Sequence, residues 1–127
     1  MQDERSAVIE IGGMTYPMIL TTRATKEIAG RYGGLENLGA KLMQSENFEM
    51  ALDEVIWLIV LLANQSIMIH NLKNRDDPKP LLTEEEVELL TNPIELSEYK
   101  TAIMEAMFRG TKRYVQGEES SKNPEAE

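Results

Sequence analysis

Hydrophobic residues near the start of the chain fall into two short runs with a pair of glycines between them. The runs Ala7–Ile11 and Met14–Leu20 flank Gly12 and Gly13, and glycine adopts the positive φ angles of a two-residue β-turn without steric cost. The pattern therefore predicts a β-hairpin over residues 7–20. One face of this hairpin is then apolar and carries Ala7, Ile9, Ile11, Met14, Tyr16 and Met18.

The predicted hairpin needs support, because two strands alone are barely stable in water. It must pack on helices of its own chain or offer an edge to a partner. In a register that pairs Ile11 with Met14, Glu10 and Thr15 lie on the opposite, more polar face. Pro17 interrupts the donors of the second strand, and the open sheet edge is a candidate docking site.

Helical spacing of apolar residues begins after the hairpin. Thr21 or Thr22 can cap a helix that ends at Gly33-Gly34. A short helix is expected from Leu35 to about Met43, and Ser45 or Asn47 can cap a long helix over Phe48–Lys73.

Two further helices are predicted after a proline-containing loop over residues 74–80. Thr83 and Glu86 have the spacing of a capping box. Asn92, followed by Pro93 at the first helical position, opens a last helix that we expect to end near residues 114–115.

The long helix contains an apolar segment without interruption, Val55–Ala63. Nine helical residues span only about 13 Å, against about 30 Å for the hydrocarbon core of a bilayer, so we do not expect a transmembrane segment. A helix that is apolar on all sides is buried on all sides, either by its own domain or at a subunit interface. The sequence leaves both possibilities open.

These elements define the predicted fold class: α+β and mostly α, with the hairpin packed on a bundle of about four to five helices around one long central apolar helix. The 127 residues (14.4 kDa) are expected to form one domain over residues 1–115. From residue 116 onward no aliphatic residue is larger than alanine, which predicts a disordered acidic tail over residues 116–127.

Charge and composition exclude several classes of function. The formal net charge is −9, which argues against nucleic-acid binding and against docking on anionic membranes. The chain has no cysteine, so it has no disulfide or thiolate chemistry, and this suits a reducing cytoplasm. We expect no signal peptide, because residues 1–5 are polar and no long apolar stretch follows them. Eight methionines either fill gaps in the core or form an adaptable binding surface.

No catalytic or metal-binding constellation is apparent. The single histidine, His70, has no second histidine or cysteine as a partner, which favours a structural or surface role. The acidic run Glu84–Glu88 lacks the pattern of a calcium loop and is better explained as a helix start. Asp53 and Glu54 are interpreted as the polar side of the long helix. We therefore expect neither an enzyme, nor a cofactor, nor a bound metal.

Three segments resemble a known family. Ile9–Met18 contains the pattern I-x-G-x-x-Y-P, Thr21–Ile28 a central Lys-Glu pair, and Arg31–Gly33 a Tyr-Gly helix stop. Together they resemble the tail assembly chaperones of long-tailed bacteriophages and prophages from Gram-positive hosts, over about the first quarter of the chain. Met14 departs from the pattern, which has Lys or another polar residue there, and makes the hairpin more apolar.

The resemblance implies a non-enzymatic role in virion morphogenesis. Such chaperones coat the long helical tape measure protein, bring major tail tube protein to it, and are absent from the mature virion. The implied location is the cytoplasm of the bacterial host. For the client-binding surface we predict Ile56, Trp57, Val60, Ile103 and Met107, because the long helix and the last helix carry excess apolar surface.

Two questions stay open at the level of sequence. In many such phages a ribosomal frameshift makes a longer chaperone, and codons for Ser121, Lys122 and Asn123 can contain an A-AAA-AAC slippery heptamer, although other codons encode them equally well. The alternative function is a small dimeric helical interaction module, such as a regulator or an antitoxin-like adaptor. In that module the long helix would be buried against a second copy.

Overall fold

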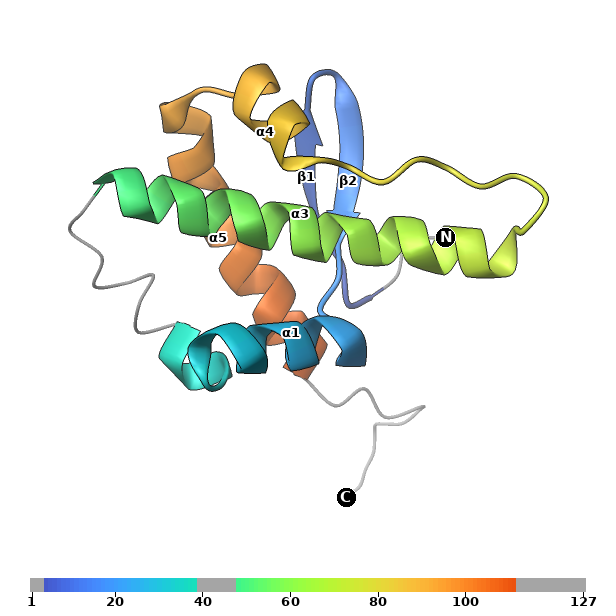
Figure 1. The fold of residues 1–127 in the computed structure, drawn as a ribbon, viewed down its shortest axis with the longest axis horizontal. Helices are drawn as coiled ribbons and strands as arrows, with labels where there is room; N and C mark the ends of the chain where they lie inside the picture. Colours follow the sequence, from blue (N-terminus) through green and yellow to red (C-terminus); the bar gives the residue numbers. More distant parts are fainter. Residues whose placement is uncertain (1–3, 39–47, 112–127) are drawn as a thin grey trace.

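The computed structural model describes residues 4–38 and 48–111, with only the backbone of residues 48–51 included. A two-stranded antiparallel sheet precedes a mainly helical domain with one long apolar helix (Figure 1), so the predicted α+β, mostly α class is confirmed. The elements are β1 (Ala7–Ile11), β2 (Met14–Met18), α1 (Thr22–Tyr32), α3 (Phe48–Lys73), α4 (Glu84–Leu90) and α5 (Pro93–Thr111).

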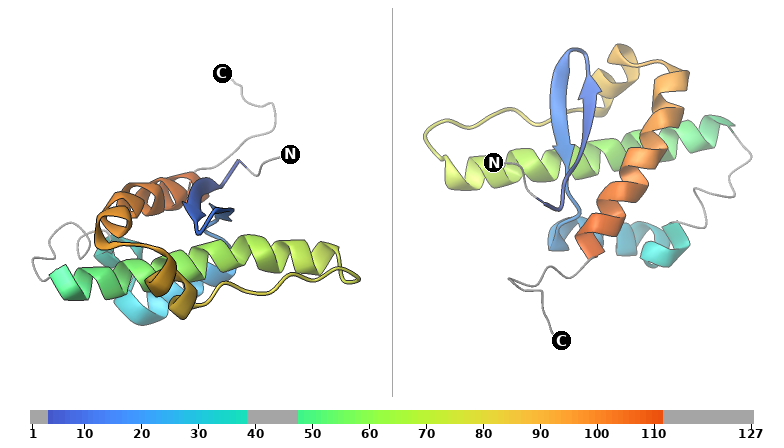
Figure 2. Two further views of the ribbon diagram at one scale, coloured as in Figure 1. Left: turned by 90° about the horizontal axis from the view of Figure 1, so that it is seen from above. Right: turned by 180° about the vertical axis from the view of Figure 1, so that it is seen from behind.

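Helix α3 is the centre of the arrangement. The hairpin and α5 lie side by side behind it, whereas α1 and α4 flank it below and above (Figures 1 and 2). This leaves one side of α3, the side facing the viewer in Figure 1, without a covering element among the described residues. The layering therefore gives α3 a buried side and an outward side.

The hairpin has the predicted register. Ile11 pairs with Met14, and the turn glycines Gly12 and Gly13 have φ angles of 58° and 82°. Met14 lies on the apolar face of the hairpin but is 60% exposed. The hairpin tip extends past α3 toward α4 (Figure 1), where Ile11 is buried and its partner Met14 is not. The buried residues of this face are Ala7, Ile9, Ile11 and Met18.

The predicted helix caps are present where the structure describes them. The Thr21 hydroxyl accepts the Ala24 N–H at 3.1 Å, and Gly33 ends α1 with a φ of 87°. The capping box of Thr83 and Glu86 is complete. Residues 35–38 are helical, while the rest of the expected short helix and the Ser45 and Asn47 caps lie outside the described residues, as does everything after Thr111.

Helix α3 buries most of its apolar segment within the single chain. It contacts α1, α4, α5 and β2, and these neighbours enclose the side chains of Val55, Leu58, Ile59 and Leu62, each at most 1% exposed. Burial of this kind contributes about 1.5–3 kcal/mol for each large aliphatic side chain. The segment is thus enclosed by its own domain, except along the outward side.

Two asparagines fasten the α3–α4 linker to α3. The Asn64 amide donates to the Leu82 carbonyl at 2.9 Å and accepts the Leu82 N–H at 2.7 Å. Asn71 makes the same pair of bonds with Lys79, at 3.0 and 2.8 Å. Seven helical residues rise about 10.5 Å, and three extended residues span about 10 Å. The linker therefore runs back along α3 in a matching register.

Candidate functional site

A groove lies between β2 and the α3–α4 linker. Its volume is about 620 Å³, within the roughly 300–1,000 Å³ of preformed ligand sites. Met14, Leu81 and Leu90 are 60%, 46% and 54% exposed, so the groove offers apolar surface that the fold does not use. We call this the β2 groove; it is lined by residues 11–12, 14–17, 66–67, 70, 79–82, 86 and 90.

The sheet register leaves main-chain groups of β2 free at this groove. The turn closes on the pair Ile11–Met14, so hydrogen-bonded pairs alternate and the N–H and C=O of Thr15 point away from β1. On the equivalent edge of β1, the Tyr99 hydroxyl of α5 donates to the Glu10 carbonyl at 2.6 Å. Farther along, the Ile19 N–H donates to the Leu62 carbonyl of α3. Among the described residues, Thr15 keeps an unused donor and acceptor.

Polar side chains of the β2 groove are held by local structure. The His70 ring bonds to the Asp77 carbonyl at 3.0 Å at the end of α3, and Glu86 accepts the Thr83 N–H in the capping box. Burial raises the pKa of the Tyr16 hydroxyl, and the negative charge of Glu86 raises it further. The described residues contain no group of three or more His, Cys, Asp or Glu that could hold a metal ion.

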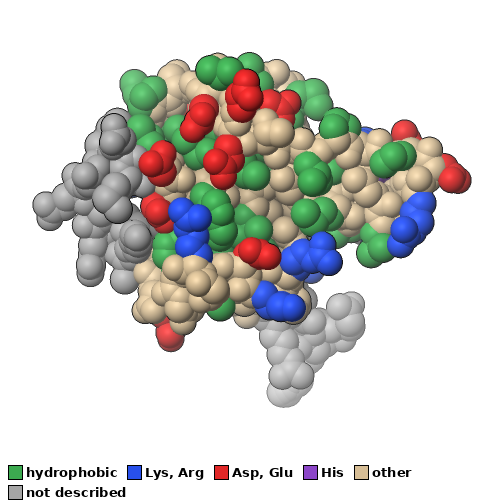
Figure 3. Space-filling model, in the orientation of Figure 1, with side chains coloured by type: hydrophobic (Ala, Val, Ile, Leu, Met, Phe, Trp, Pro, Cys, Tyr) green, Lys and Arg blue, Asp and Glu red, His purple; other side chains and the backbone are tan. Residues whose placement is uncertain are grey.

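A second surface lies on the outward side of α3. Trp57, Val60, Leu61 and Met68 are partly exposed there and line a shallow depression of about 190 Å³. We call these four residues the α3 strip. Hydrophobic side chains appear across this face in Figure 3, with acidic groups and basic groups beside them.

One end of the α3 strip has a fixed geometry. The Arg31 guanidinium lies 4.3 Å from the centroid of the Trp57 ring, and the Tyr32 ring meets Trp57 edge to face at 6.0 Å. Arg31 also pairs with Glu54 at 3.4 Å. A cation over an indole ring contributes about 0.5–1 kcal/mol at an exposed site. These contacts hold the indole in place while part of its surface stays accessible.

Comparisons with models of protein families, with curated proteins and with solved structures found no match to this chain. Functional inference therefore depends on the two surfaces themselves.

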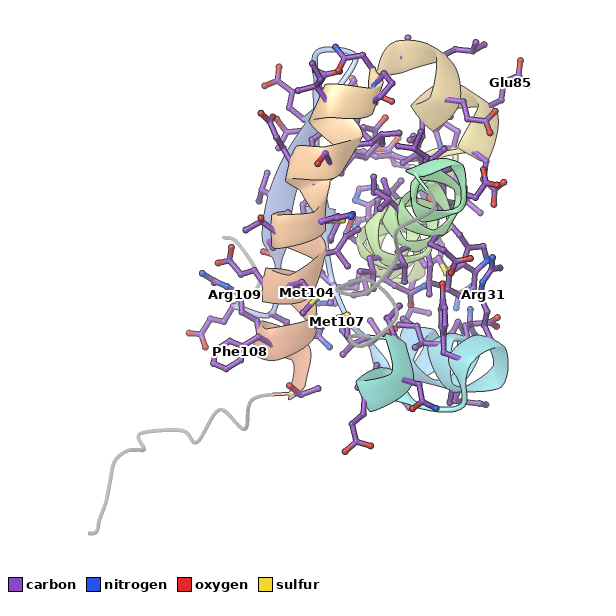
Figure 4. All side chains as sticks on the ribbon, turned by 90° about the vertical axis from the view of Figure 1, so that its left-hand side faces the viewer. Arg31, Glu85, Met104, Met107, Phe108 and Arg109 are labelled. Atoms are coloured by element: carbon purple, nitrogen blue, oxygen red, sulfur yellow. The ribbon has the colours of Figure 1, made fainter. Side chains whose placement is uncertain are left out.

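The structure divides the five residues predicted to bind a client. Trp57 and Val60 are on the α3 strip and partly exposed. Ile56, Ile103 and Met107 are 7%, 0% and 8% exposed, so a partner could reach them only if helices separated. On α5, Met107 lies on the inner side, whereas Phe108 and Arg109 project outward (Figure 4).

By length and composition, Leu52–Lys73 could cross a bilayer, with a mean hydropathy of 1.7. The core helix of a soluble protein passes the same test. Here Asn64 and Gln65 are buried polar residues in the middle of α3, and both are bonded within the domain. Thr21, the cap of α1, donates to Gln65 across the α1–α3 contact. These bonds are those of a helix packed against protein.

Proposed function

We propose that this protein is a phage tail assembly chaperone that binds segments of the tape measure protein and recruits major tail tube protein, and that it is not an enzyme. The observation that supports the proposal best is the β2 groove, whose apolar walls remain exposed in the folded domain. A groove of this kind beside a sheet edge suits the capture of an extended polypeptide segment.

The binding mode follows from the groups at the groove. A client strand placed beside β2 can exchange two hydrogen bonds with Thr15 and donate one to the Pro17 carbonyl. Apolar client side chains can contact Leu81 on the opposite wall. The hydrogen bonds orient the client strand and contribute roughly 0.5–1.5 kcal/mol each to binding. Burial of apolar side chains contributes most of the affinity.

The charge of the chain fits the role of a helper protein. A formal net charge of −9 keeps a protein with exposed apolar surface soluble through mutual repulsion. The function would be exercised in the cytoplasm of the bacterial host, before the virion is complete.

The test is binding of tape measure segments to the full chain. We expect at least one segment to bind, and Leu81→Glu to weaken it about tenfold or more, equivalent to about 1.4 kcal/mol, because it places a charge on the groove wall. Leu72→Glu is the matched control: Leu72 is 63% exposed and does not line the groove. Calorimetric titration measures both affinities.

Failure of every segment to bind the folded chain would refute the chaperone proposal. Equal weakening by both variants would show that the β2 groove is not the site. A dimer in which the outward side of α3 is shielded from solvent would instead favour the interaction-module alternative. Circular dichroism of each variant verifies that the helices are intact.

A further inference from the structure

Three large apolar residues are exposed where α4 is followed by α5. Leu89 and Leu90 end α4, and Ile94 is the second residue of α5; they are 74%, 54% and 73% exposed. The buried residue of α4 is Val87, so the core does not use these three side chains. Helix α4, the start of α5 and the hairpin turn form one end of the molecule (Figures 1 and 2). Exposed apolar side chains gathered at one place are typical of an interaction surface.

Local contacts hold this end of the molecule in one shape. A connection of two residues joins the helices. The second of them, Asn92, exchanges two hydrogen bonds with Glu95: its N–H donates to the Glu95 carboxylate and its amide oxygen accepts the Glu95 N–H, both at 2.9 Å. Leu90 lies against the hairpin turn, since a Cβ added at Gly12 would be 3.0 Å from its Cδ1. A partner therefore meets a preformed surface, which reduces the entropy lost on binding.

Carboxylates stand beside the apolar side chains. Between residues 80 and 99 the sequence has six glutamates and neither Lys nor Arg. Glu85 comes one turn before Leu89 in α4, and Glu98 comes one turn after Ile94 in α5, so each carboxylate shares a side of its helix with an apolar residue. Both glutamates are exposed, and neither forms an ion pair with another described residue. Glu85 projects outward from α4 (Figure 4).

The basic residues nearest in sequence lie away from this surface. Lys79 lines the β2 groove, but its main chain is bonded to Asn71 near the C-terminal end of α3, on the far side of the hairpin from α4 (Figures 1 and 2). Lys100 follows Ile94 by six residues, about 9 Å along α5 and on a different side of the helix. Over α4 in Figure 3, acidic and hydrophobic side chains stand next to one another, whereas the basic groups of this face lie lower and toward the far end of α3.

We propose that this surface, which we call the α4–α5 corner and which consists of Leu89, Leu90, Ile94, Glu85 and Glu98, binds a basic amphipathic segment of another protein. Apolar side chains of the segment contact Leu89 and Ile94, and Lys or Arg beside them pairs with the two carboxylates. Nucleic acids and anionic membranes do not fit, because their phosphates would face carboxylates. A second copy of the chain would bring the same carboxylates together. The inference does not depend on the chaperone proposal.

Three dye-labelled peptides of equal length test the chemistry of the partner. The first carries leucine and lysine, the second has glutamate in place of lysine, and the third has serine in place of leucine. Fluorescence anisotropy measures their binding to the full chain. We expect the first peptide to bind, and the other two to bind at least about tenfold more weakly, because each lacks one of the two kinds of contact. Added salt should weaken the first peptide.

The carboxylates are tested by Glu85→Gln/Glu98→Gln. Neither side chain belongs to a capping box, which Glu86 and Glu95 supply, so the helices should be kept. Loss of two exposed ion pairs should weaken the first peptide about fivefold. Glu36→Gln/Asp76→Asn is the matched control, because it removes the same net charge from exposed positions outside α4 and α5. It should change the affinity less than about twofold.

The apolar contact is tested by Leu89→Gln. Burial of this leucine by the partner is lost, so the first peptide should bind about fivefold more weakly. Leu72→Gln is the matched control: Leu72 is also a helical leucine and is 63% exposed, but it lies at the end of α3. It should leave the affinity within about twofold of that of the unsubstituted chain. Circular dichroism verifies that each variant keeps its helices.

Three results would overturn the inference. The first peptide does not bind, or a corner variant and its control weaken it equally, which would show attraction by overall charge or by any exposed leucine. The third is a dimer of the chain that Leu89→Gln dissociates, because a second copy would then occupy the corner. The chaperone proposal has a separate readout, since Leu81 is outside the corner and Leu90, which lines the β2 groove as well, is unchanged in every variant.

Discussion

Removal of the Asn64 side chain tests how the linker is held, and its cost follows from burial. Asn64→Ala takes both hydrogen-bond partners from Leu82, whose residue surface is 3% exposed. A buried N–H or C=O without a partner costs about 1–3 kcal/mol. We therefore expect Asn64→Ala to reduce the free energy of unfolding by about 2–4 kcal/mol, or the melting temperature by on the order of 10 °C.

Asn71 provides a matched control in the same helix. It forms an identical pair of bonds, but its partner Lys79 is exposed. Water replaces the amide there, so Asn71→Ala should cost less than about 1 kcal/mol. Urea unfolding followed by circular dichroism measures both variants. Equal costs, or a cost below about 1 kcal/mol for Asn64→Ala, would refute the argument that burial of Leu82 decides the energy.

Two further predictions concern packing and pH. Gly110→Ala would place a Cβ 2.5 Å from the Leu20 Cβ, so it should destabilise the domain by about 1–3 kcal/mol. Gly30 has open space around it, so Gly30→Ala in helix α1 should stabilise the domain by up to about 1 kcal/mol. Thermal unfolding of both variants checks the difference in sign. Burial raises the pKa of Tyr99, and Glu95, Glu10 and Glu98 raise it further. The neutral Tyr99 hydroxyl therefore stabilises the fold fully below about pH 10, and this contribution should be lost as the pH rises through the folded-state pKa. In that pH range the urea midpoint of Tyr99→Phe should fall less steeply than the midpoint of the unsubstituted protein.

Local signals in the sequence predict the elements well. The 26 residues of α3, Phe48–Lys73, have the predicted bounds, because an uninterrupted apolar segment precedes a loop that two prolines keep out of a helix. Gly12 and Gly13 fixed the hairpin register through their positive φ angles. These features depend on residues close together in the chain, so the sequence alone is enough to predict the helix bounds and the hairpin register.

The linker path depends on contacts distant in sequence and could not be predicted in the same way. Asn64 and Leu82 are 18 residues apart. The only sequence signal is an asparagine directly after the apolar segment, with Asn71 two turns later on the same side of α3. Since the linker forms one wall of the β2 groove, the groove could not be predicted either.

The division of the five predicted client-binding residues has a similar cause. Ile103 and Trp57 are both large apolar residues at helical spacing, and nothing local to either says which one the fold will cover. Ile103 is fully buried, whereas part of Trp57 remains exposed because no described element packs over that side of α3. Periodicity identifies an apolar side of a helix. It does not distinguish a core contact from a binding surface.

The small number of free main-chain groups on the β2 edge limits how tightly the β2 groove could hold a client strand. After β2 the Ile19 N–H bonds to α3, and Pro17 has no N–H, so on the described β2 edge only Thr15 offers both a donor and an acceptor. A client strand could form three hydrogen bonds here, two with Thr15 and one with the Pro17 carbonyl. At roughly 0.5–1.5 kcal/mol each, these bonds are too few to hold a permanent complex or to start the growth of a long sheet. Affinity must then come from side chains that match Leu81 and its neighbours. An edge restricted in this way favours binding that is selective and easily reversed, which is what the proposed chaperone function would require.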